Sequence, residues 1–224
     1  MTLVLLIPYS QGCILLADRQ DSYSDSDSKQ ERTKLLLQSA NGPALGCTGD
    51  SRFIENLFAT IREKWGSLQG DTYNRFKGLY EKLLVETHEQ NKLTGARINL
   101  VIETILVEVQ NGNIVSFGAA GPLRSRTINC QRIAAAPEDF PEVQQYLRID
   151  SKNLSEKEAV DLGEQILRQM CFLRYTVGPP EYHGYDYIKI TPEGVFEGKT
   201  VGAKLLRLDP SQLLSKVHIE QEEI

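Results

Sequence analysis

The sequence has no long apolar run. None approaches the roughly 20 residues of a membrane-spanning helix, so we expect no membrane partner. The first residues also lack the basic region and cleavage site that are typical of a secretory signal peptide. From these absences we expect a cytoplasmic protein.

An excess of basic residues is also absent. The 224 residues include 30 Asp and Glu against 25 Lys and Arg. A protein that binds nucleic acid through its phosphates needs a basic stripe. We therefore expect no nucleic-acid partner.

Cysteine and histidine are scarce, and both are scattered. The four cysteines form no CxxC pair: Cys13, Cys47, Cys130 and Cys171. The three histidines lie far apart and have no Ser or Cys partner: His88, His183 and His218. The carboxylates of residues 21–28 lack the Gly and the terminal Glu of a calcium loop, so this segment is predicted to be an exposed loop. We expect no disulfide framework, no metal and no cofactor.

Short apolar runs open the chain. Residues 3–7 and 12–17 predict two buried strands, joined by a tight turn at residues 8–11. Residues 35–37 and 43–46 predict the next hairpin.

Two amphipathic stretches follow. Asp50 is a favourable N-cap residue for the first helix. Apolar residues recur at helical spacing in both stretches: Phe53, Ile54, Leu57, Phe58, Ile61 and Trp65, then Tyr73, Phe76, Tyr80, Leu83 and Leu84. The pattern predicts two helices, each with one apolar face.

The second half begins with strands. Asn111-Gly112 is the strongest short hairpin signal of the chain, and it lies between apolar runs at residues 98–109 and 113–117. A further strand is predicted near residues 126–133.

A capping box marks the next helix. Ser155 and Glu158 precede the apolar positions Ala159, Leu162, Ile166, Leu167 and Met170. Residues 187–190 and 194–196 predict closing strands, and residues 210–218 predict a short terminal helix. The order of strands, helix pair, strands, helix and strands predicts an α+β fold, a four-layer αββα sandwich, as a single domain over residues 1–224.

Thr2, Asp18 and Lys34 give the strongest functional signal. A small second residue permits removal of Met1, after which Thr2 carries a hydroxyl nucleophile and a free α-amine as its own base. The reference pKa of an α-amine, about 7.7–8.0, suits it to accept a proton near neutral pH. A protonated Lys34, held by Asp18, would favour the neutral amine and the ionised hydroxyl.

The residues around this trio resemble the start of a proteasome β-type subunit, an N-terminal-nucleophile hydrolase. The matching segments are Thr2-Leu3-Val4, Gly12 to Arg19 and Gly46-Cys47-Thr48-Gly49-Asp50. In that family the Asp and the Lys lie 16 and 32 residues after the catalytic Thr, as they do here. A Gly of the corresponding turn supplies an oxyanion-hole amide. The resemblance, strong over residues 2–65, implies catalytic roles for Thr2, Asp18, Lys34 and Gly46.

The resemblance is weaker in the second half. Proteasome-type subunits carry an Asp and a Ser, followed by Gly-Gly, just after the helix that begins here at Ser155, and these residues position the N-terminal amine. In this sequence Arg174 stands at the Asp position, Val177 at the Ser position and Gly178-Pro179 in place of Gly-Gly. A further supporting Ser has no counterpart near residues 134–136. We therefore expect weak turnover of generic short peptides.

The resemblance implies a threonine-dependent amide hydrolase, a peptidase that acts on peptides or unfolded chains. It also implies a homo-oligomeric ring in which the Thr2 sites face an enclosed space. Two alternatives stay open. One is a proteasome-like oligomeric scaffold without activity, and the other is an enzyme that transfers an acyl group from acyl-Thr2 to an amine other than water.

Overall fold

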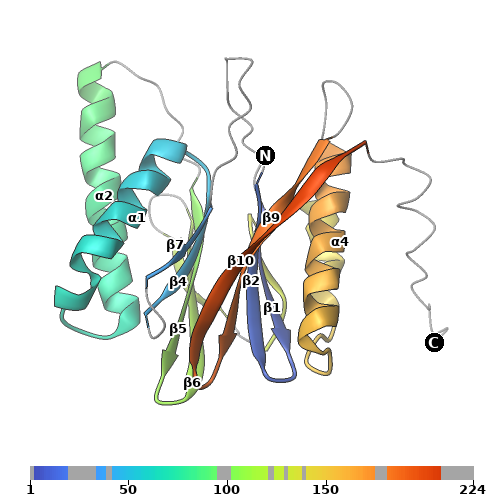
Figure 1. The fold of residues 1–224 in the computed structure, drawn as a ribbon. Helices are drawn as coiled ribbons and strands as arrows, with labels where there is room; N and C mark the ends of the chain where they lie inside the picture. The colour runs from blue at the N-terminus through green and yellow to red at the C-terminus, as the bar shows by residue number, and fades with distance from the viewer. Residues whose placement is uncertain are drawn as a thin grey trace.

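Two five-stranded antiparallel sheets pack face to face in the middle of the molecule (Figure 1). The computed structural model describes residues 3–19, 34–38, 42–94, 102–120, 124–128, 131–137, 140–174 and 181–207. The first sheet has the strand order β10-β9-β2-β1-β8, and the second has the order β3-β4-β5-β6-β7.

Most neighbouring strands are consecutive in the chain. The first sheet contains β1 (Val4–Tyr9), β2 (Gly12–Asp18), β8 (Ala134–Ala136), β9 (Glu181–Thr191) and β10 (Gly194–Arg207). The second contains β3 (Leu35–Leu37), β4 (Ala44–Thr48), β5 (Glu103–Gln110), β6 (Asn113–Ala120) and β7 (Arg124–Ile128). The first sheet therefore joins the beginning of the chain to its last described strands.

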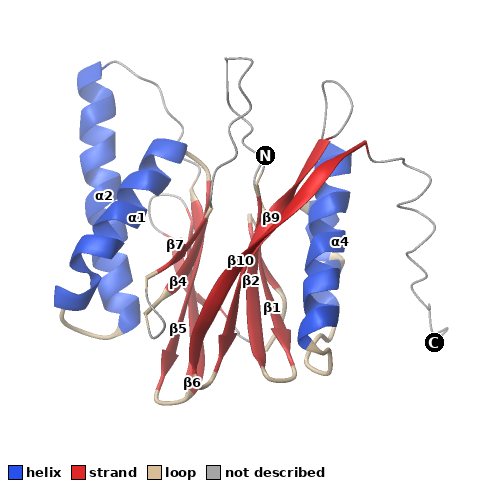
Figure 2. Ribbon diagram, in the orientation of Figure 1, coloured by secondary structure: helices blue, strands red, loops and turns tan. Residues whose placement is uncertain are grey.

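Helices cover the outer faces of both sheets (Figure 2). The second sheet is covered by α1 (Ser51–Lys64), the 3₁₀ turn η1 (Trp65–Ser67) and α2 (Thr72–Thr94). The first is covered by α3 (Pro141–Gln144), the 3₁₀ turn η2 (Tyr146–Arg148) and α4 (Glu156–Arg174). This order of layers agrees with the predicted α+β sandwich. Over the described part of the chain, no helix is long and apolar enough to span a membrane.

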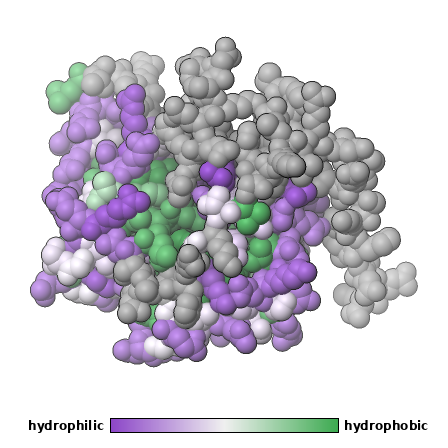
Figure 3. Space-filling view, in the orientation of Figure 1, coloured by the Kyte–Doolittle hydropathy of each residue, from purple (hydrophilic) through white to green (hydrophobic). Residues whose placement is uncertain are grey.

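Three apolar cores lie between the four layers. One joins α4 to the first sheet, a second joins α1 and α2 to the second sheet, and the third fills the space between the sheets. In the space-filling view, hydrophilic residues dominate the visible surface of the helix pair, and hydrophobic residues gather toward the middle of that face (Figure 3). Burial of these apolar faces is the main force that holds the layers together.

Short-range sequence signals produced the expected local structure. Asp50 Oδ1 accepts a hydrogen bond of 2.9 Å from the amide three residues on, which caps α1. Ser155 N donates to Glu158 Oε2 at 2.7 Å, and Glu158 N donates back to Ser155 Oγ at 3.3 Å, so the predicted capping box is confirmed. Asn111 and Gly112 have φ values of 51° and 74°, as a tight hairpin turn requires.

The first hairpin differs from its prediction. Tyr9 pairs with Gly12 and Pro8 pairs with Cys13, so the turn contains only Ser10 and Gln11 and the predicted turn at residues 8–11 was too long. Asp18 N donates to Leu3 O, so the odd-numbered residues of β1 direct their backbone N and O toward β2. Pro8 N therefore faces away from β2, toward the side where β8 pairs only with Val4 to Leu6. A proline fits there because no ladder bond is lost.

Several other boundaries were also predicted incorrectly. The strand expected near residues 126–133 is divided: β7 ends at Ile128, and residues 134–136 form β8 in the other sheet. The closing strands β9 and β10 are much longer than residues 187–190 and 194–196. The predicted loop at 21–28 and the predicted helix at 210–218 lie outside the described residues.

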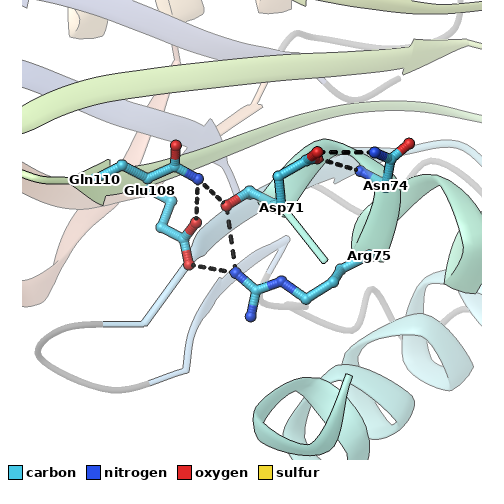
Figure 4. Close-up of polar contacts among 6 residues, drawn as sticks. Asp71, Asn74, Arg75, Glu108 and Gln110 are labelled. Carbon is cyan, nitrogen blue, oxygen red and sulfur yellow. Dashed lines mark hydrogen bonds and ion pairs between the residues drawn. The ribbon is translucent and has the colours of Figure 1, made fainter. Parts of the chain in front are cut away.

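A polar network fastens the start of α2 to β5 (Figure 4). Arg75 Nη2 lies 3.3 Å from Glu108 Oε1 and 3.4 Å from Thr72 Oγ1. Gln110 Nε2 donates to Thr72 Oγ1 and, at 3.1 Å, to Glu108 Oε2. The Arg75 guanidinium also lies 4.6 Å from the centroid of the Trp65 ring, a cation–π geometry. The network joins helix to sheet through side chains alone.

Candidate active site

The carboxylate of Asp18 binds the beginning of the described chain. Leu3 is the first described residue, and its backbone N donates to Asp18 Oδ1 at 2.8 Å. Asp18 N donates in turn to Leu3 O at 3.4 Å. Thr2, the predicted nucleophile, lies outside the described residues, but the residue after it is fixed by Asp18.

The second oxygen of the same carboxylate binds Lys34. Lys34 Nζ donates to Asp18 Oδ2 at 3.0 Å, and both residues are buried, with 6 % and 8 % of their surfaces exposed. Asp18 ends β2 in one sheet and Lys34 directly precedes β3 in the other, so the pair spans the two sheets. The predicted ion pair is therefore present, while its catalytic role stays a prediction. Such burial requires both partners, because removal of one leaves the other charge unpaired.

Lys34 is also held through its backbone. Its carbonyl oxygen accepts a hydrogen bond of 3.0 Å from Cys47 N, one residue beyond the last paired residues of β3 and β4. This bond sets the position from which the lysine side chain reaches Asp18.

Gly46, the predicted oxyanion donor, has a clear packing role in β4. A Cβ atom placed on Gly46 would lie 2.4 Å from Val4 Cγ1 and 3.2 Å from Leu35 Cδ2. Since Cys47 N faces β3, strand alternation directs Gly46 N toward β5, where Gly46 pairs with Ile105. Close packing of the two sheets thus accounts for a glycine at this position.

The turn between β4 and α1 offers another backbone donor. Gly49 is exposed and has a φ of 115°, a conformation that favours glycine. Because amides alternate along a strand, Gly49 N continues the series that faces the Lys34 side of β4. Gly46 stays the predicted oxyanion donor, and Gly49, which directly precedes the N-cap residue Asp50, is a second candidate.

A second ion pair lies one residue beyond Asp18. Arg19 Nε is 3.8 Å from Asp186 Oδ1, and Thr200 Oγ1 donates to the same oxygen at 2.7 Å. Arg19 N donates to Gly184 O at 3.2 Å. The sequence reading missed this group because β2, β9 and β10 meet only through the sheet.

The residues that stand in place of the family's amine-positioning Asp, Ser and Gly-Gly are described only in part. Arg174 ends α4, but its side chain and residues 175–180 lie outside the described part of the structure. Residues 134–136 form β8, which pairs with Val4 to Leu6. The predicted departure from the family therefore stays a prediction.

Two other kinds of chemistry find little support among the described residues. Cys13 and Cys47 are both buried, and burial raises the pKa of the Cys47 thiol well above its usual value, which makes it a poor nucleophile. The described residues contain no group of three or more His, Cys, Asp and Glu that could hold a metal ion.

The comparisons with known proteins identify the fold. No family model and no curated protein matches the chain. Two solved structures of Anbu from Hyphomicrobium sp. strain MC1, one of them a mutant, superpose with a TM-score of 0.67 each, at 13 % and 14 % identity. The mutant match covers 91 % of this chain and 89 % of the Anbu chain, and the other match covers 95 % and 90 %. At this level of identity the likeness shows the fold alone, and this fold is proteasome-like.

Proposed function

We propose that the protein is a threonine-dependent amide hydrolase, a peptidase that uses Thr2 after removal of Met1. One observation supports this function above all: a single buried carboxylate, that of Asp18, binds both the backbone N of Leu3 and the ammonium of Lys34. Lys34 and the residue after Thr2 thus share one carboxylate, and a lysine charge near Thr2 would favour its neutral amine and ionised hydroxyl.

In the proposed reaction the Thr2 hydroxyl oxygen attacks the carbonyl carbon of a peptide bond. The hydroxyl proton passes to the α-amine of Thr2 and then to the departing amine as the C–N bond breaks. Water next attacks the acyl-Thr2 ester, releases the acid and restores the hydroxyl. The Lys34 charge favours the neutral amine and the developing alkoxide, while Asp18 holds Lys34 in place.

The oxyanion of the tetrahedral intermediate needs a backbone donor, worth about 2.7–4 kcal/mol. The predicted donor was Gly46, whose N faces β5. Gly49 is the alternative that the turn favours, because it is exposed and its N faces the side on which Lys34 lies. Gly49 is therefore added to the proposed site beside Thr2, Asp18, Lys34 and Gly46.

The test uses full-length protein that begins at Thr2. An electrophile that captures both a hydroxyl and the adjacent amine should form a covalent adduct, which peptide mass mapping places on Thr2. Thr2→Ser keeps both groups and should label, whereas Thr2→Val keeps the size, loses the hydroxyl and should not. An adduct on Thr2→Val would place the reactive group elsewhere and refute the proposal.

Three further measurements separate the alternatives. N-terminal sequencing of native protein should find Thr2 first, and a chain that keeps Met1 cannot use the Thr2 amine as base. Absence of any adduct on correctly processed protein would favour the inactive scaffold. If product analysis with an added amine gives an acylated amine in place of the acid, the enzyme is an acyltransferase. The implied ring should sediment as a homo-oligomer well above the 25.2 kDa of one chain.

A further inference from the structure

The side of α2 that points away from the sheets carries a continuous stripe of exposed residues. They recur at intervals of four and three residues, which aligns them along one side of a helix: Gly78, Lys82, Val85, Glu89 and Lys92. We call this set the outer stripe. The opposite side of α2 packs into the apolar core beneath it. Figure 1 shows α2 at the outer margin of the molecule, so the outer stripe is open to a partner.

Gly78 is a costly residue for its place in the outer stripe. It lies inside α2, where glycine stabilises a helix less than alanine does. Among the described residues, a Cβ atom on Gly78 would meet no atom within 4 Å, so packing against them does not require a glycine. Close approach of another molecule to the helix explains a glycine there.

The charges of the outer stripe are arranged symmetrically about Val85, which is 58 % exposed. Lys82 lies three residues before Val85, and Glu89 lies four residues after it. If two identical helices run antiparallel across a two-fold axis at Val85, Lys82 of each copy reaches the level of Glu89 of the other. Lys92 likewise comes within one turn of Glu81, which flanks the stripe. Each attractive pair then occurs twice, so the stripe is complementary to itself.

Within one chain these charges are paired only in part. Lys82 Nζ lies 3.8 Å from Glu86 Oε1, and the two side chains are 67 % and 50 % exposed. Glu89 and Lys92 form no ion pair with any described residue. The second half of the stripe therefore offers an acid and a base to a partner.

We propose that the outer stripe of α2 binds a second copy of this chain, with the two α2 helices packed antiparallel across a two-fold axis at Val85. The two Val85 side chains meet at the centre, and Lys82 and Glu89 pair across the interface. The stem of Lys92 crosses Gly78 of the second copy. A standard protein interface buries about 1,200–2,000 Å², and one pair of helices is at or below this size, so the contact is reversible.

A charge swap tests the pairing. Lys82→Glu places carboxylates opposite Glu89 at both ends of the contact. The dissociation constant of the two copies, from sedimentation at a series of concentrations, should rise roughly tenfold because two surface pairs are reversed at once. Glu89→Lys should have the same effect. The double variant restores opposite charges and should recover wild-type association.

Lys77 provides a matched control. Lys77 Nζ lies 3.8 Å from Glu81 Oε1, with side-chain exposures of 44 % and 43 %, so its pair within the helix resembles that of Lys82. Lys77 points about 100° around the helix from Gly78 and lies outside the outer stripe. Lys77→Glu should therefore destabilise α2 as Lys82→Glu does, but it should not weaken association.

Gly78→Ala separates association from stability. Alanine should raise the melting temperature, because it favours the helix and its methyl group has room in the single chain. The same methyl group lies in the path of the Lys92 stem of the second copy, so association should weaken. Loss of stability by itself cannot produce these opposite effects.

The decisive experiment uses purified full-length protein. Val85→Cys lies on the proposed axis, so mild oxidation should join two copies through residue 85, which peptide mass mapping identifies. A disulfide requires Cα atoms about 4.4–6.8 Å apart, so it reports this contact whatever larger assembly the chain forms. Lys77→Cys is exposed on the same helix and should not cross-link. Addition of Lys82→Glu to Val85→Cys should slow the cross-link, and further addition of Glu89→Lys should restore its rate.

Each outcome has one meaning. A cross-link at residue 85 that weakens with Lys82→Glu and recovers in the charge swap supports the inference. Equal rates at residues 77 and 85 indicate random collision and overturn it, as does absence of a cross-link at residue 85. If residue 85 is joined in cells to a different protein and never to a second copy, the outer stripe serves another partner and the inference is wrong.

Discussion

Two ion pairs, one between α2 and β5 and one between the two sheets, differ in what else they bind. Arg75 and Glu108 bind Thr72 and Gln110, so their network closes on itself between α2 and β5. Asp18 and Lys34 join the two sheets, and the remaining carboxylate oxygen takes the backbone N of Leu3. The first arrangement is explained by stability alone. The second binds Leu3, the residue after Thr2, which is why the proposed chemistry is placed there.

Breaking the ion pair between Asp18 and Lys34 should have the largest effect. Lys34→Met removes the ammonium that balances the charge of the buried Asp18 carboxylate, so we expect a loss of about 3–5 kcal/mol in the free energy of unfolding. Labelling of Thr2 should fall by roughly 10³-fold or more, because the cation beside the nucleophile is gone. Urea denaturation and the labelling rate measure the two effects.

A double variant separates these effects. Asp18→Asn with Lys34→Met removes both charges and should recover part of the stability without recovering the labelling. Labelling of Lys34→Met at the wild-type rate would contradict a catalytic role for Lys34. The Asp18–Lys34 pair would then be structural, like the Arg75–Glu108 pair.

Gly46→Ala tests the packing beside the same pair. The new methyl group would meet Val4 Cγ1 at 2.4 Å, so we expect a loss of about 1–3 kcal/mol. Val4→Ala in the same chain makes room, and the double variant should be less destabilised than the sum of the single variants. Additive losses, measured by chemical denaturation, would show that the contact with Val4 is not the cause.

Arg75→Met breaks the network between α2 and β5. Glu108 keeps Gln110 as a donor, so the expected loss is smaller, about 1–2 kcal/mol. The labelling rate of the folded protein should not change. A drop in that rate at a temperature where the variant is folded would remove the distinction between the two networks.

Tyr9→Phe should have the smallest effect at neutral pH, within about 0.5 kcal/mol. Burial, together with the charge of Glu156, raises the pKa of Tyr9 from 10.0 to about 12. The folded state therefore favours the neutral phenol, and its contribution is complete below pH 10 and is lost as the pH rises toward 12. Thermal melts between pH 9 and pH 12 should show a shallower alkaline decline for Tyr9→Phe, and equal slopes would contradict this assignment.

Signals that act within a few residues could be read from the sequence. Asp50 caps α1, Ser155 and Glu158 form their box, and Asn111-Gly112 makes its hairpin. Each motif depends on hydrogen bonds or dihedral angles of neighbouring residues, so contacts with distant parts of the chain have little effect on it. The apolar periodicity likewise predicted the order of layers.

Tertiary structure decided the rest. Whether residues 134–136 join β1, how far β9 and β10 extend, and which way the Gly46 amide faces all depend on strand register, which is set by partners distant in the sequence. The spacing of Asp18 and Lys34 suggested a pair, but only the packing of two sheets brings them together. Arg19 and Asp186 gave no local signal, because their proximity exists only where β2 meets β9.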